Sequence, residues 1–354
     1  MHLLKTHDEY KLSIFIWLIT LTIMVLAIII IGGLTRLTDS GLSMVDWQPI
    51  LGTIPPLSLN DWNEKFELYK LSPEYLYVNK NMSLVEFKYI FWWEWFHRFF
   101  ARMIGLVMIL PLLYFTYKKY IKISLHVRLL FIFLLGALQA FVGWWMVKSG
   151  LSDDPYVSAY RLTFHLFNAL LIFLLLLWTT MEYYYSKNVN FFKIKLNLEF
   201  LILIAILLTL FTIITGGFMA GTHAGQSFNT YPLMNGKIIP DDYYLYDLGL
   251  LNMFENTIAI NFNHRWMGTF TFIYVFSLFL FLMLNKNFKT SNLIFLFVLI
   301  ALSTQFFLGI LTLLSNVHIP YASLHQANSV ILLSTLMISY YHSKIRNSNN
   351  VNQK

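Results

Sequence analysis

The sequence has no cysteine and few charged residues. Without cysteine, disulfides, thiolate metal ligands and thiol-based electron relays are all excluded. Charged residues make up 12% of the 354 positions, whereas soluble domains typically carry about 25%. Hydrophobic residues make up 57% of the chain, so the composition indicates a membrane protein rather than a soluble enzyme.

In place of charge, the sequence has long hydrophobic blocks. A helix needs about 20 residues to cross a bilayer, and eight blocks reach about that length, with long polar connections at 34–89 and 221–259. Such blocks must be helical because lipid offers backbone groups no hydrogen-bond partners, and the short alternating segments of a membrane β-barrel are absent. We predict an all-α membrane protein with eight transmembrane helices, at residues 13–33, 90–117, 126–147, 160–181, 200–220, 260–284, 291–313 and 321–341.

The net charge of +7 does not indicate nucleic-acid binding, because the charges follow the membrane. Lys and Arg gather at the cytoplasmic flanks of membrane helices. With a cytoplasmic N-terminus, every inner connection is basic and most acids fall in outer loops. We therefore predict that both termini are cytoplasmic. Because the first block lacks a cleavage site and no transit peptide precedes it, we expect a bacterial inner membrane. The inner basic residues are Lys5, Lys11, Lys118, Lys119, Lys122, Arg128, Lys187, Lys193, Lys195, Lys286, Lys289, Lys344, Arg346 and Lys354.

The chain also has the pattern of two copies of one four-helix unit, a feature that sets the architecture. Four motifs recur in the same order, at offsets that shrink steadily along the chain. An even number of helices per copy makes this a parallel repeat, unlike the inverted repeats of many transporters. We predict two four-helix bundles, residues 1–190 and 191–354. The motif pairs are Gly32-Gly33 with Gly216-Gly217, His97-Arg98 with His264-Arg265, Gln139…Gly143 with Gln305…Gly309, and His165…Asn168 with His325…Asn328.

Four of the ten histidines lie near the outer ends of predicted helices, one pair per copy. Ionisable residues inside membrane helices are costly and usually functional, although lone histidines often only bond across helices. Zinc would need further ligands, and only Glu94 is near. Haem needs one or two axial ligands, and small residues such as Gly105 and Gly268 would admit the macrocycle. The matched pairs therefore predict haem, ligated by His97, His165, His264 and His325.

Two further features accompany these histidines. Arg98 and Arg265 directly follow two of them and are suited to haem propionates, although snorkelling to lipid phosphates would explain them equally well. Glu94 precedes His97 by three residues on one helix face, whereas Asn261 takes that place before His264. One copy with a carboxylate indicates one working and one supporting site. An ion pair between Glu94 and Arg98 is the alternative.

Together these motifs resemble the haem A synthase family, over residues 13 to 341. The resemblance implies oxidation of the C8 methyl of haem O to the formyl group of haem A by successive hydroxylations. It makes His97 and His165 the substrate-haem pair with Glu94 as the essential acid, and His264 and His325 the ligands of a resident haem B. The cysteine-free chain is similar to the proteobacterial and mitochondrial branch. The matching residues are Gly32 to Thr38, Ser40 to Ser43, Trp47-Gln48-Pro49, Glu94 to Arg98, Gln139, Gly143-Trp144, His165, Gly217 to Ser227, Asn263 to Arg265 and Leu324 to Gln326.

The resemblance also sets the expected partners. These are haem O and haem A, membrane lipid, haem O synthase, an electron donor and cytochrome oxidase assembly factors, with no nucleic acid; homo-oligomerisation stays open. The alternative function is a di-haem b-type cytochrome that carries electrons without modifying haem. It would need the four histidines but not Glu94. A transporter fits less well, because no helix is clearly broken at the bilayer midplane.

Overall fold

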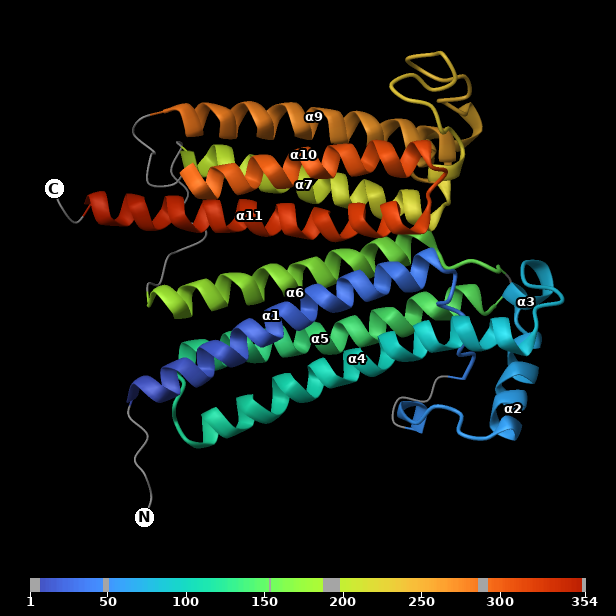
Figure 1. The fold of residues 1–354 in the computed structure, drawn as a ribbon, viewed down its shortest axis with the longest axis horizontal. Helices are drawn as coiled ribbons and strands as arrows, with labels where there is room; N and C mark the ends of the chain where they lie inside the picture. The colour runs from blue at the N-terminus through green and yellow to red at the C-terminus, as the bar shows by residue number, and fades with distance from the viewer. Residues whose placement is uncertain (1–6, 47–50, 153, 187–197, 286–291, 352–354) are drawn as a thin grey trace. The chain divides into compact units, whose positions relative to one another are not determined.

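The computed structural model describes residues 7–46, 51–152, 154–186, 198–285 and 292–351 (Figure 1). Over these residues the protein is helical, and no β-strand forms beyond an isolated bridge between Met234 and Lys237. Several residues of the sequence argument lie outside the described ranges. They are Trp47-Gln48-Pro49 and the lysines at 5, 187, 193, 195, 286, 289 and 354.

Eight long helices form at the eight predicted blocks; seven are longer than their blocks, and α10 has the same length as its block. The extra turns are polar and continue the helices beyond their apolar parts. α4, for example, starts at a capping box, in which Ser83 Oγ accepts from the Glu86 N–H and the Glu86 carboxylate accepts from the Ser83 N–H. The helices are α1 (His7–Leu37), α4 (Leu84–Tyr117), α5 (Ile123–Gly150), α6 (Ala159–Tyr185), α7 (Leu198–Gly221), α9 (Thr257–Leu284), α10 (Asn292–Leu314) and α11 (Ile319–Val351).

Within the described residues, seven of these helices are long and apolar enough to cross a membrane. This confirms an all-α membrane protein. The eighth long helix, α11, is not among the seven. Its N-terminal half carries His325, Gln326, Asn328 and Ser329, and these polar residues lower its hydropathy. The predicted count of eight membrane spans therefore stays a prediction.

The chain forms two compact units, Met1–Thr180 and Met181–Lys354, here called unit 1 and unit 2. In unit 2, α7 packs on α9 and α11, and α10 packs on the same two helices, so that the four helices close a ring. In unit 1, α4 packs on α1 and α5. α6 joins α5 through Asn168 and Gln139, and joins α1 through the Thr22 and Thr180 hydroxyls, 3.1 Å apart. The predicted boundary at 190 falls within 187–197, outside the described residues.

The long connection between α1 and α4 contains two short helices that the sequence did not predict, α2 (Leu59–Lys70) and α3 (Pro73–Tyr77), after a 3-10 turn at Leu51–Thr53. They lie at the end of the bundle where α1 ends and α4 begins (Figure 1). Trp62, Phe66 and Tyr69 of α2 form a buried aromatic core with Phe87 and Phe91 of α4. The connection is therefore a folded cap on unit 1. The corresponding segment of unit 2 holds η2 (Ala224–Gln226), η3 (Tyr246–Leu251) and α8 (Asn252–Glu255).

Candidate functional site

Each of the four helix-borne histidines lies with its ring against a glycine on a neighbouring helix. A methyl group at any of these glycines would come within about 3 Å of the imidazole Cε1, so alanine would displace the ring. The sequence argument expected the small residues of the site to lie on the histidine helices themselves. A Cβ at one of these, Gly105, would meet no atom within 4 Å, and the glycines that contact the rings lie on the neighbouring helices instead. The glycine-to-Cε1 distances, taken from the added Cβ, are 3.1 Å for Gly32 and His97, 3.1 Å for Gly143 and His165, 3.2 Å for Gly216 and His264, and 2.9 Å for Gly309 and His325.

The structure brings the predicted histidines together in the predicted pairs. His97 of α4 and His165 of α6 are close enough to interact electrostatically within unit 1. His264 of α9 and His325 of α11 do the same within unit 2. In the described part of the chain, no group of three His, Asp or Glu side chains converges as a metal-ion site. Each unit thus offers a pair of imidazoles, which is the ligand set of a six-coordinate haem iron.

The two pairs differ at the ring nitrogen Nδ1. In unit 2, His264 Nδ1 lies 2.8 Å from the Thr215 hydroxyl, and His325 Nδ1 lies 3.1 Å from the Gln305 carbonyl oxygen. In unit 1, the Nδ1 atoms of His97 and His165 are buried and have no hydrogen-bond partner among the described residues. A histidine ligand normally donates its second nitrogen to a partner, so only unit 2 has the complete arrangement.

Unit 1 contains further buried polar atoms without partners in the described structure, namely Trp95 Nε1 and Thr163 Oγ1. Trp95 lies two residues before His97, and Thr163 two residues before His165. Buried polar groups in proteins are nearly always hydrogen-bonded. Residues two apart on a helix do not face each other, so these two groups are neighbours of the histidines in sequence only, and the unpartnered atoms of the site itself are Nδ1 of His97 and of His165. The residues present in both units fit haem.

Glu94 is buried on α4 and bonded to the loop that follows α1. Its carboxylate accepts hydrogen bonds from the Ser43 hydroxyl at 2.6 Å and from the Met44 backbone N–H at 2.8 Å. Arg98 pairs with the same carboxylate at 2.5 Å and donates to the Met44 carbonyl at 3.3 Å. The ion pair considered from the sequence is thus present, as one part of a larger connection between α4 and this loop.

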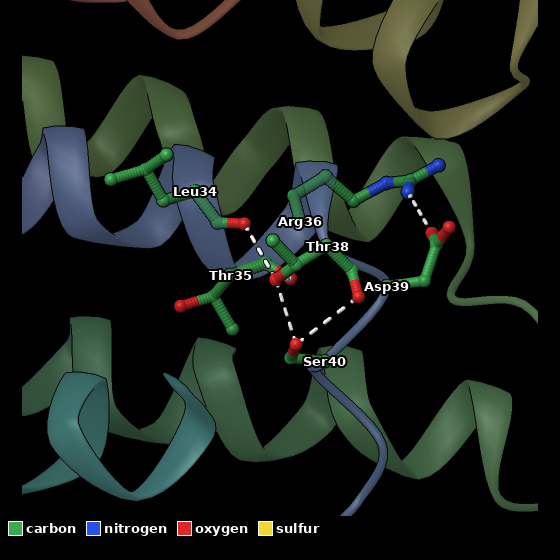
Figure 2. A network of polar contacts seen from close by, with 6 residues as sticks. All are labelled: Leu34, Thr35, Arg36, Thr38, Asp39 and Ser40. Carbon is green, nitrogen blue, oxygen red and sulfur yellow. Dashed lines mark hydrogen bonds and ion pairs between the residues drawn. The ribbon is translucent and has the colours of Figure 1, made fainter. Parts of the chain in front are cut away.

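The loop reaches Glu94 because α1 ends in a compact network of polar contacts (Figure 2). The Thr38 hydroxyl donates to the Leu34 carbonyl at 2.9 Å, and the Ser40 hydroxyl lies 2.7 Å from that of Thr38. Arg36 pairs with Asp39 at 2.6 Å, and Asp39 adopts a φ of 46°. This left-handed residue ends the helix and turns the chain toward α4.

Unit 2 makes the same connection without a carboxylate. His223, with a φ of 55°, ends the regular turn after α7. Asn261 then donates to the Ala224 carbonyl at 2.7 Å and accepts from Arg265 Nε at 2.7 Å. A neutral amide is therefore sufficient to join helix, arginine and loop. The negative charge of Glu94 is what unit 1 has in addition.

The two arginines hold the loops that follow α1 and α7 in their own units. Arg265 donates to the carbonyls of Thr230 at 2.7 Å and Phe228 at 2.5 Å, and Arg98 bonds Glu94 and the Met44 carbonyl. Sequence reasoning missed this role, because the loop carbonyls lie more than 30 residues away along the chain. The expectation that Arg98 and Arg265 bind haem propionates stays a prediction.

A cationic pocket of about 350 Å³, where α5 ends and α6 begins, was also missed. It is lined by Lys148 and Arg161, with Trp145, Ser149 and Ser152. The Arg161 guanidinium lies 4.4 Å above the Trp145 ring and donates to the Trp145 carbonyl at 2.7 Å. Arg161 precedes His165 by four residues, a spacing that puts both on one helix face. That spacing was the available signal.

A second buried acid, Glu74 of α3, lies in the cap of unit 1 and was not singled out from the sequence. The Tyr69 hydroxyl donates to its carboxylate at 2.8 Å, and Asn79 donates to the Tyr69 oxygen at 2.8 Å. Burial raises the pKa of Glu74 to about 8, and the nearby carboxylate of Glu94 adds to the increase. Glu74 is therefore mostly protonated at neutral pH.

A family model and similar known proteins place this chain in the same family. The COX15-CtaA family model, described as a cytochrome oxidase assembly protein, matches residues 15–337. The chain is 42% identical to the "Heme A synthase" of Nitrosospira multiformis, over 94% of both chains. It is 41% identical to the protein of the same name from Pelagibacter ubique, over 97% of this chain and 98% of that one.

Proposed function

This chain belongs to the COX15-CtaA family of cytochrome oxidase assembly proteins, and we propose that it acts as a haem A synthase, an oxidoreductase that converts haem O to haem A. The C8 methyl of haem O is hydroxylated twice, giving an alcohol and then a geminal diol. The diol loses water and leaves the formyl group. Each hydroxylation removes two electrons from the methyl carbon, which an external oxidant must finally accept. A bound haem iron would supply the oxidising chemistry, while the protein supplies binding, orientation and electrostatics.

In this proposal, His97 and His165 of unit 1 hold the substrate haem, and His264 and His325 of unit 2 ligate a resident haem B. The glycine against each imidazole supports the four assignments, because a larger residue at that position would crowd the ring. The unpartnered Nδ1 atoms of His97 and His165 support a site for an exchangeable substrate. The satisfied Nδ1 atoms of unit 2 support a permanent cofactor.

Glu94 is the proposed catalytic acid. It is a buried carboxylate on the same helix face as His97, three residues away. The connection to the loop does not require a charge, because the neutral amide of Asn261 makes the matching connection in unit 2. A fixed carboxylate can accept a proton from, or stabilise positive charge on, a reacting methyl group beside the macrocycle. The observation that carries the proposal is this one asymmetry between two otherwise matched units, Glu94 against Asn261.

The propionates of the substrate need cationic partners near the outer surface. We propose Arg98 and Arg265 for this role, in which they would use guanidinium N–H groups that do not bond the loop carbonyls. The pocket of Lys148 and Arg161 supports a further contact in unit 1, since a helix rises about 6 Å over the four residues from His165 to Arg161. At the repeat-related positions, unit 2 has Leu314 and Tyr321. The extra cations therefore belong to the unit proposed to recognise substrate.

The membrane arrangement completes the proposal. α11 would serve as an eighth span, and residues 1–190 and 191–354 would form parallel bundles in a bacterial inner membrane with both termini cytoplasmic. The basic connection at Lys118, Lys119 and Lys122, followed by Arg128, supports this orientation. Haem O synthase, an electron donor and cytochrome oxidase assembly factors are the proposed partners, and homo-oligomerisation stays open.

Extraction of haems tests the function directly. The chain is expressed in cells that make haem O but have no other haem A synthase, and the extracted haems are separated and identified. Haem A in these cells, and only haem O in cells with an empty vector, is the expected result. Two bound b-type haems with no haem A would instead favour the electron-carrying cytochrome, which the relatives do not support.

A further inference from the structure

The hydrogen bond at His264 determines which ring nitrogen is available for a ligand. The Thr215 hydroxyl donates its only proton to the Thr212 carbonyl at 2.7 Å, so at 2.8 Å from His264 Nδ1 it acts as an acceptor. The Thr212 carbonyl also interacts with this histidine, and it too can only accept. Nδ1 must therefore carry the proton, and Nε2 has the free lone pair that binds iron.

The partner histidine of unit 2, His325, contacts both the backbone and the side chain of Gln305. His325 Nδ1 lies 3.1 Å from the Gln305 backbone carbonyl, which can only accept. The Gln305 side chain is itself held, because its amide oxygen accepts from Asn328 at 2.9 Å. The Gln305 side-chain Nε2, which can only donate, lies 3.2 Å from Nδ1 and 3.4 Å from Nε2 of the same ring. Of the two unit 2 histidines, it is therefore His264 whose contacts fix the proton on Nδ1.

In unit 1 the ring positions are the same but this support is missing. A Cβ placed on Gly32 would lie 3.1, 3.6 and 4.0 Å from Cε1, Nδ1 and Nε2 of His97, and one placed on Gly216 would lie 3.2, 3.8 and 3.9 Å from the same atoms of His264. The residue before Gly216 is Thr215, and the residue before Gly32 is Ile31. The isoleucine has no hydroxyl, and His97 Nδ1 is without a partner in the described structure. One side chain therefore accounts for the difference at this ring.

We propose that Thr215 is a positioning residue that makes unit 2 retain its haem, and that Ile31 at the matching position makes unit 1 release its haem. A hydrogen bond from Nδ1–H fixes the ring and raises the basicity of Nε2, which strengthens the bond to iron. A cofactor that stays bound benefits from this, whereas a product that must leave the enzyme does not. The inference rests on the proposed haem sites and deepens them by assigning the origin of their different affinities.

The test measures haem loss from each unit separately. In a His165→Ala background only unit 2 keeps its histidine pair, and in a His325→Ala background only unit 1 does. Each purified protein is mixed with an excess of an apo-globin as haem acceptor, and transfer is followed by absorbance. In unit 2, Thr215→Val should speed haem loss by about 10-fold, the lower end of the effect of such partners, because the Thr212 carbonyl remains.

Matched variants separate positioning from packing. Thr209→Val removes a buried hydroxyl on the same helix that bonds only the Ala205 carbonyl, and it should leave haem loss unchanged. Thr215→Ser keeps the hydroxyl and should behave as wild type. In unit 1, Ile31→Thr should slow haem loss, whereas Ile31→Val should not. The midpoint potential of the unit 2 haem should rise in Thr215→Val only, because a less basic ligand stabilises ferric iron less.

Equal haem loss and equal potential in Thr215→Val and Thr209→Val would overturn the inference. The same holds if Ile31→Thr leaves haem loss from unit 1 at the wild-type rate. These outcomes are independent of catalysis, since no haem O is converted in the assay. If Thr215→Val loses haem faster but the wild type makes no haem A in cells, the proposed function fails and the positioning role stands.

Discussion

Oε2 of Glu94 lies 2.8 Å from the backbone nitrogen of Met44, fifty residues earlier in the chain. This contact joins the N-terminal half of α4 to the loop after α1 and buries a carboxylate three residues before His97. In unit 2, Asn261 reaches the Ala224 carbonyl in the corresponding place. The two contacts have the same structural effect but opposite hydrogen-bond polarity, so the charge of Glu94 can be tested apart from its connection.

Glu94→Gln should leave haem bound in both units but reduce conversion of haem O by about 100-fold or more, the usual scale for loss of an acid–base group. Glutamine keeps the size and one acceptor oxygen, so the fold should persist. The measurement is the ratio of haem O, hydroxylated intermediate and haem A extracted at equal protein level. Ser43→Ala, which removes one hydrogen bond and no charge, serves as control. Near-normal haem A from Glu94→Gln would leave only the structural role.

His264→Ala and His325→Ala should each abolish the low-spin bis-histidine spectrum of haem B. Their rings are the only imidazoles that the described part of unit 2 brings together, and alanine cannot ligate iron. Visible absorption of the purified reduced protein measures this. His126→Ala, at a ring that bonds Thr116 near the start of α5, should keep the spectrum. An unchanged spectrum in either site variant would refute the assignment.

Arg161→Gln together with Lys148→Gln should raise the KM for haem O by about 10-fold and change kcat little. Hydrogen bonds to a charged group contribute about 1.5–3 kcal/mol, and this pocket is partly exposed, so the lower end applies. Lys122→Gln, at the opposite end of α5, is the matched control. A KM that responds equally in both variants would point to general attraction by charge rather than to this pocket.

The cap of unit 1 should lose stability as the pH rises. Burial first, and then the carboxylates of Glu94 and Asp39, raise the pKa of Glu74 from 4.5 to about 8. A raised pKa means that the folded state binds the proton more tightly. The stabilisation is therefore complete below about pH 4.5 and is lost as the pH passes about 8.

Glu74→Gln should remove this pH dependence. One pKa unit corresponds to about 1.4 kcal/mol, so the wild type should lose on the order of a few kcal/mol between about pH 5 and 8. Protease cleavage of the 34–89 connection as a function of pH is the measurement. Glu67→Gln, at an exposed acid paired with Lys70, should follow the wild type. A pH profile shared by Glu74→Gln and the wild type would contradict the assignment.

The membrane orientation can be tested with single cysteines, because the chain has none of its own. Leu71→Cys in the cap and Leu250→Cys in the second long connection replace exposed residues, and both should react with an impermeant thiol reagent in cells with a permeabilised outer membrane. Lys118→Cys should react only after the inner membrane is opened. The reverse pattern would invert the topology.

The sequence by itself determined the helices, the histidines and the matching motifs of the two halves. Hydropathy over about 20 residues is a local property, so the blocks at 90–117 and 160–181 correspond to α4 and α6. The sequence also showed the repeated glycines, but not that each one packs against a histidine ring. Glu94 against Asn261 could also be read directly, because it is one position in a repeat.

Only the tertiary structure decided what these residues contact. That Gly32 supports His97, that Thr215 holds His264, and that Arg161 shares a pocket with Lys148 depend on how each helix is rotated and at what depth it packs. A difference of one residue in rotation turns a side chain by about 100° around the helix axis, and hydropathy does not specify it so finely. The cap formed by α2 and α3 likewise depends on aromatic packing against α4. No local pattern in the polar sequence of this segment predicts that packing.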